Sequence, residues 1–145
     1  MANESTITKL NSLLKAEYGC LVHRLGECTP FVTWPAADDR AVVQQMLADA
    51  KSHQHDLINL ILKLRGSPVP PAYPTYVGGV HYLNLSYLMP QVIAGLRGLV
   101  RLYEQGGPTG HTESDALASR ILSDHKRHLA ELERMHSNLA ASAAR

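Results

Sequence analysis

Apolar residues recur at three- and four-residue steps in four stretches of the chain, which is the spacing of amphipathic helices with one face in a core. The first stretch covers Ser5 to Leu25, and the second covers Arg40 to Arg65, with Gly66 as the expected C′ stop. The third runs from His81 or Met89 to Gln105, and the last from Thr112 to Leu139. The pattern therefore predicts an all-α domain of four helices.

Proline- and glycine-rich segments separate these stretches. Residues 26–39 (GECTPFVTWPAADD) form a connector, and we expect Phe31 and Trp34 to cap one end of the core. The segment from Gly66 to Gly79 holds four prolines and cannot be regular helix. Because ~14 extended residues can span ~45 Å, it predicts a crossover along the bundle, with the second and third helices parallel. Thr112-Glu113-Ser114-Asp115 resembles a capping box at the start of the last helix.

Composition and charge narrow the class of protein. The chain has 145 residues, 45% of them hydrophobic, so residues 1–145 are expected to form one domain with a frayed tail over 140–145. Lys and Arg number 14 against 13 Asp and Glu, a net charge of +1, which argues against nucleic-acid or anionic-lipid partners. No apolar run reaches the ~18 residues of a membrane span. Cys20 and Cys28 fit no metal or disulfide spacing, so free thiols and a cytoplasmic location are expected.

Four polar residues interrupt the apolar stripes near mid-helix. Glu17 lies on the first stripe, His53 on the second, and His125 and His128 on the last. A buried carboxylate or imidazole without a partner costs several kcal/mol, so these residues need a compensating interaction. A metal cation would supply it. We therefore expect at least three of the four side-chain tips to converge within a few Å at mid-bundle.

The arrangement resembles the ferritin-like superfamily, whose bundles join two helix pairs by a long crossover and carry an inward Glu plus a Glu-x-x-His motif in each half. Glu17 in LLKAEY matches the first Glu, and His53 in ADAKSHQHDL matches the His of the first motif. His128 in DHKRHLAEL matches the His of the second motif, whereas Ala50 and His125 stand where the motif glutamates would be. The resemblance implies a ferritin-like four-helix bundle with a changed metal centre.

The changed ligand set favours one metal ion over two. A di-iron oxidase of this type needs bridging carboxylates, and the third helix offers only Gln91 near its middle. One carboxylate and three histidines fit a single Zn²⁺ or Fe²⁺, with an open position for water and Lewis-acid chemistry. Asp49, Asp56 and Asp124 lie beside the histidines and could accept their second ring N–H, although helical geometry points them sideways. Tyr103 is expected at the core edge, with its hydroxyl reaching outward.

Two other functions stay open on the sequence. In a non-catalytic bundle, Glu17 would pair with Arg24 or a protonated histidine, and the protein would act through dimerisation or a partner. A DinB-like hydrolase or transferase would also use one metal and three histidines, but its His-rich motif with a following Gln is absent. We also expect a homodimer, because further apolar residues widen the stripes of the first two helices: Leu13, Cys20, Val22, Val42, Leu47, Ile58 and Leu62.

Overall fold

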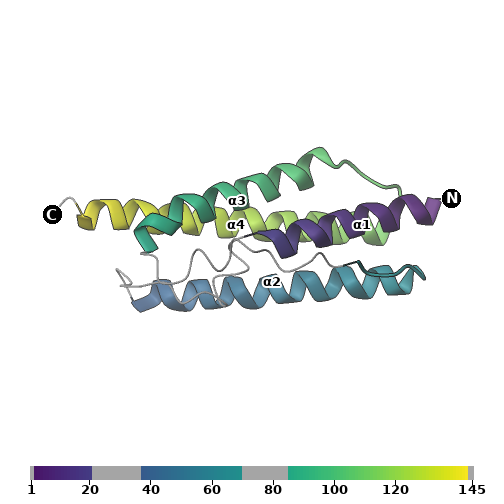
Figure 1. Cartoon of the computed structure of the whole chain (residues 1–145), viewed down its shortest axis with the longest axis horizontal. Coiled ribbons are helices and arrows are strands. Elements are labelled where there is room, and N and C mark those ends of the chain that lie inside the picture. Colours follow the sequence, from purple (N-terminus) through teal and green to yellow (C-terminus); the bar gives the residue numbers. More distant parts are fainter. Residues whose placement is uncertain (1, 21–36, 70–84, 144–145) are drawn as a thin grey trace.

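The computed structural model describes residues 2–20, 37–69 and 85–143, which form four α-helices and no strand (Figure 1). The helices are α1 (Ala2–Gly19), α2 (Ala37–Lys63), α3 (Leu85–Gln105) and α4 (Thr112–Ala143). The prediction of an all-α bundle is thereby confirmed. Along the described parts of the chain, no helix is both long and apolar enough to cross a membrane.

The helix boundaries differ from the predicted ones mainly at the ends. Helix α1 ends at Gly19, before the predicted Leu25, and α4 continues through Ala143, past the predicted end at Leu139. The described part of α3 begins at Leu85, before the predicted start at Met89, and has Pro90 inside it, whereas the alternative start at His81 lies outside the described residues. Pro90 is the sixth residue of the described helix, so its missing N–H removes one hydrogen bond from the second turn of α3.

Contacts at one end of the bundle fix the directions of the helices. Lys63 at the end of α2 forms an ion pair with Glu113 at the start of α4, at 2.8 Å. The short connection between α3 and α4 places the end of α3 there as well, and Lys9 of α1 donates to the backbone oxygen of Gly106 at 3.0 Å. Helices α2 and α3 therefore run parallel, as predicted, and α1 and α4 run the opposite way (Figure 1).

The connection from Lys63 to Leu85 consequently joins opposite ends of the bundle. The path of its residues 70–84 lies outside the described part of the chain, as do Phe31 and Trp34, the predicted core caps. The end of α2 is described. Arg65 adopts a left-handed conformation with φ 64°, and the N–H of Gly66 donates to the oxygen of Ile61 at 2.9 Å. The C′ position is thus Arg65 and the predicted stop, Gly66, follows it.

Where the side chains are described, the core contains the apolar stripes of the four helices, with two differences. Leu102 has the spacing of the stripe on α3 but is 39% exposed, because the buried face of α3 passes through Val92, Leu96, Leu99 and Tyr103. The second difference is on α1, which contacts both α2 and α3 and therefore buries a wider arc than one stripe. Leu13 and Cys20, predicted to widen an outer apolar surface, are buried within the single chain. The core cluster includes Leu10, Leu14, Val43, Met46, Leu57, Ile61, Leu88, Leu96, Ile121, Leu132 and Met135.

The start of α4 is capped one residue earlier than predicted. The backbone N–H of Ser114 donates to the ring Nδ1 of His111 at 3.2 Å, so His111 is the capping residue, and the predicted capping box at Thr112 is wrong. Asp115 instead accepts hydrogen bonds from the backbone N–H and the hydroxyl of Thr109 in the preceding loop. These bonds hold the pKa of Asp115 below its usual value and fix the loop that turns α3 into α4.

Candidate metal centre

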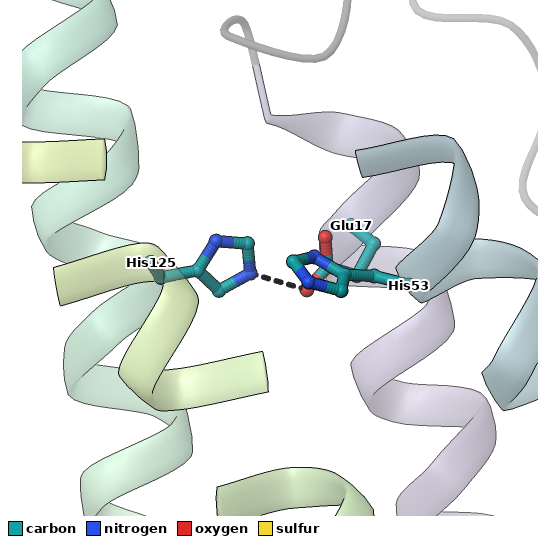
Figure 2. A group of neighbouring side chains, drawn as sticks. All are labelled: Glu17, His53 and His125. Atoms are coloured by element: carbon teal, nitrogen blue, oxygen red, sulfur yellow. Dashed lines mark hydrogen bonds and ion pairs between the residues drawn. The ribbon is translucent and has the colours of Figure 1, made fainter. Parts of the chain in front are cut away.

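Three side chains from three helices meet in the interior of the bundle. Glu17 of α1, His53 of α2 and His125 of α4 each place one ligand atom within 4.8 Å of the other two. In Figure 2 the His125 ring faces the Glu17 carboxylate, and His53 lies beside that carboxylate. All three residues are buried, at 0%, 3% and 0% exposure. The predicted convergence of at least three tips is therefore seen.

One oxygen of the Glu17 carboxylate has two polar neighbours. The Nε2 atom of His125 lies 2.7 Å from Oε1 (Figure 2), and the hydroxyl of Tyr103 donates to the same Oε1 at 2.7 Å. Burial and then the neighbouring Glu17 charge raise the pKa of Tyr103 far above its usual value, so the phenol stays protonated and acts as a donor. The predicted outward hydroxyl of Tyr103 is wrong. Its place four residues after Leu99 on the α3 stripe was the signal that could have found it.

His53 is oriented by a carboxylate on the neighbouring helix. Its Nε2 atom lies 2.8 Å from Oδ2 of Asp124, and its Nδ1 atom is buried with no hydrogen-bond partner among the described residues. A carboxylate next to Nε2 favours the tautomer that carries the proton there, which leaves the lone pair on Nδ1. A metal-binding histidine is commonly held by a carboxylate in this way. The buried Nδ1 lone pair is thus an available ligand.

His128, the fourth predicted ligand, is not in the converging group. Its Nε2 atom lies 2.9 Å from Oδ2 of Asp49, and its ring centre is 6.4 Å from that of His53 and 6.3 Å from that of His125. A step of three residues along a helix is about 60° short of a full turn. The side chains of His125 and His128 therefore point in different directions. His125 faces Glu17 of α1, and His128 leans toward α2.

The pair of His128 and Asp49 is a neutral imidazole beside a charged carboxylate. Burial lowers the pKa of His128, and the hydrogen bond and charge of Asp49 offset this only in part. Burial acts to raise the pKa of Asp49, but hydrogen bonds from Gln45 and His128 outweigh it and leave that pKa below its usual value. Near neutral pH, His128 therefore donates a hydrogen bond to an ionised Asp49.

The remaining candidates lie elsewhere. Of the three aspartates predicted to orient histidines, Asp49 and Asp124 do so, whereas Asp56 pairs with Arg120 at 2.5 Å. Gln91 and His55 are exposed. Arg24, the alternative partner considered for Glu17, lies outside the described residues.

Comparison of the chain with protein-family models, with curated proteins and with solved structures finds no match. The structure itself defines the class: an all-α four-helix bundle with a buried Glu/His/His group within metal-binding distance. One carboxylate and two imidazoles are ligands that zinc and iron accept, and three protein ligands leave a coordination position for water or substrate.

Proposed function

We propose that this protein binds one divalent transition-metal ion, Zn²⁺ or Fe²⁺, through Glu17, His53 and His125. The observation that carries the proposal is the convergence of these three buried ligand atoms from three different helices, all within 4.8 Å of one another. Ligands at ~2.0 to 2.2 Å from a common tetrahedral ion lie ~3.3 to 3.6 Å from each other, so the three side chains would draw slightly closer together around an ion. A cation would neutralise the Glu17 carboxylate and give the Nδ1 atom of His53 a partner.

The bundle that holds this centre is proposed to be ferritin-like and cytoplasmic. The parallel run of α2 and α3 supports the ferritin-like assignment, as do the glutamate on α1 and the histidine on α2. In this proposal His128 does not coordinate the ion, because its ring is hydrogen-bonded to Asp49. The DinB-like alternative with three histidine ligands is disfavoured for the same reason: the third ligand of the converging group is a carboxylate.

The bound ion would act as a Lewis acid on a water or substrate molecule in the open position. The chain's own contribution is to orient the ligands. Tyr103 holds the Glu17 carboxylate by a 2.7 Å hydrogen bond, and Asp124 holds the ring of His53. Bulk solvent has little access to the ligands, because the three residues are at most 3% exposed.

A second function, a non-catalytic bundle, is favoured by one specific observation. The Tyr103 hydroxyl, the Glu17 carboxylate and the His125 imidazole already form a connected hydrogen-bond network without an ion. In that case the cluster is a polar part of the core and the protein acts through its surface. Metal content distinguishes the two functions directly.

Elemental analysis after equilibrium dialysis tests the proposed function. Protein purified without a histidine tag should retain about one Zn²⁺ or Fe²⁺ per chain, and a His53→Ala/His125→Ala variant should retain none. His55→Ala is the matched control, since His55 is an exposed histidine on the same helix as His53. Equal metal content in all three proteins, or no metal in any of them, would refute the proposal.

We also propose that the chain forms a homodimer, on narrower grounds than the sequence indicated. Leu13 and Cys20 are covered within one chain, but Leu62 is 55% exposed and Val69 is 62% exposed near the end of α2. Apolar side chains that form one contiguous exposed patch are often covered by a partner. Sedimentation velocity at micromolar concentration should show a dimer, and Leu62→Lys should shift it toward monomer. A monomer in the wild-type protein would remove the proposal.

A further inference from the structure

Arg127 of α4 lies across the two carboxylates that orient His53 and His128. Its guanidinium is 3.4 Å from Oδ2 of Asp49 on α2 and 3.3 Å from Oδ1 of Asp124 on its own helix. Asp124 is the partner of His53, and Asp49 is the partner of His128. One exposed cation therefore contacts both supports of the histidines.

Side-chain exposure rises in steps from the centre to this arginine. It is 1% or less for Glu17 and His125, 4% for His53 and 9% for His128. It reaches 22% and 31% for the two carboxylates and 63% for Arg127. A hollow of about 210 Å³ between α2 and α4 is lined by Asp49 and neighbouring residues of α2 and by Arg127, His128 and Glu131 of α4. The hollow thus lies at the exposed end of this series, where Asp49 and Arg127 are.

We infer that the face between α2 and α4 is the path by which a divalent cation reaches and leaves the buried centre, and that Arg127 gates this path. The inference rests on the proposed metal function and extends it to metal exchange. Arg127 is a positioning residue in this scheme, because it acts through Asp49 and Asp124 and does not touch the ion. Its role is to control how fast the ion exchanges.

Two physical effects make Arg127 a barrier. A fixed positive charge at the mouth of a path lowers the local concentration of cations, and so lowers their association rate. The contacts with Asp49 and Asp124 also keep these carboxylates, and through them the rings of His128 and His53, in place. Without Arg127, two carboxylates would be available to an incoming ion, and the histidines would move more freely.

Arg120 provides a matched control on the same helix. It lies two turns before Arg127, its side chain is 60% exposed, and it pairs with one carboxylate of α2, Asp56. Arg120 therefore has the same charge, a similar exposure and the same kind of interhelical ion pair as Arg127. It differs in having no contact with a carboxylate that holds a histidine of the site.

Stopped-flow mixing with Zn²⁺ and a zinc indicator measures both directions of exchange. Arg127→Gln should bind Zn²⁺ about tenfold faster than wild type at low ionic strength, with the difference shrinking as salt is added. It should also release Zn²⁺ faster to a chelator, with stoichiometry unchanged. Arg127→Lys keeps the charge, but the lysine side chain is one atom shorter than the reach of Nη2, the arginine nitrogen that contacts both carboxylates. Release should therefore be faster while association stays near wild type. Arg120→Gln should match wild type.

The results separate the gate from the metal site. Arg127→Gln rates equal to those of Arg120→Gln, in a wild-type protein that binds one Zn²⁺, would overturn the gate and leave the proposed function intact. Complete loss of Zn²⁺ in Arg127→Gln would also overturn it, since Arg127 would then be required to hold the ion. A wild-type protein that binds no Zn²⁺ would refute the proposed function itself, and the gate with it.

Discussion

Zn²⁺ added to the chelator-treated protein should raise its melting temperature by about 10 °C when free Zn²⁺ is a thousandfold above Kd. At that ratio a ligand that binds only the folded state adds ~4 kcal/mol. For a chain of this length, each kcal/mol shifts the melting temperature by ~2 to 4 °C. The gain arises because Glu17, His53 and His125 come from separate helices and meet only in the folded bundle. Thermal unfolding followed by circular dichroism measures it.

Variants identify the ligands responsible for that increase. His53→Ala should abolish the rise, and His55→Ala should keep it, because only the first of these α2 histidines faces the interior. His128→Ala should keep most of the rise, since His128 lies outside the converging group. The rise should also shrink as the pH falls, because protons compete with the metal for the imidazole nitrogens. An equal rise in His53→Ala and His55→Ala would mean that Zn²⁺ binds elsewhere.

Removing His125 alone from the metal-free protein should be the most damaging single change. His125→Leu leaves the Glu17 carboxylate buried at 0% exposure without the imidazole that lies 2.7 Å from it. Removing one hydrogen-bond partner of a buried polar group costs ~1 to 3 kcal/mol, and more when that group is charged. Urea unfolding in the presence of a chelator measures the free energy of unfolding.

The matched triple variant should behave in the opposite way. Glu17→Leu/Tyr103→Phe/His125→Leu removes the whole hydrogen-bonded network and fills the space with apolar groups of similar size. Such replacements are often neutral, or stabilising by about 1 to 4 kcal/mol. A triple variant as stable as wild type, without metal binding, would show that the cluster is kept for binding and not for stability. A triple variant less stable than the His125→Leu single variant would contradict this interpretation and favour the structural function of the network.

Much of the fold could be predicted from the period of the apolar residues. The positions of the apolar stripes predict four helices and three members of the polar cluster. The length of the loop between α2 and α3 predicts that these two helices run parallel. The stripe argument works because helical geometry fixes the face on which a residue lies. The cost of burial then requires that polar residues on that face meet a partner. Glu17, His53 and His125 were accessible to this reasoning.

The same reasoning could not choose between His125 and His128, which share one stripe. The neighbouring side chains decide which histidine joins the cluster. Glu17 on α1 contacts the ring of His125, and Asp49 on α2 contacts the ring of His128. These partners are at least 79 residues apart along the chain from the histidine they contact. Their pairing depends on how three helices rotate against each other.

Tyr103 and the helix cap at His111 were missed for a related reason. A tyrosine on a stripe can point its hydroxyl inward or outward, and only the presence of a buried acceptor, Oε1 of Glu17, decides this. The capping residue of α4 depends on the path of the preceding loop, where Asp115 binds Thr109 and leaves His111 to accept from Ser114. The sequence alone determined most of the residues that are buried along each helix. The tertiary structure decided which polar atoms pair, because hydrogen bonds need a partner within about 3 Å, whereas apolar burial needs only a face.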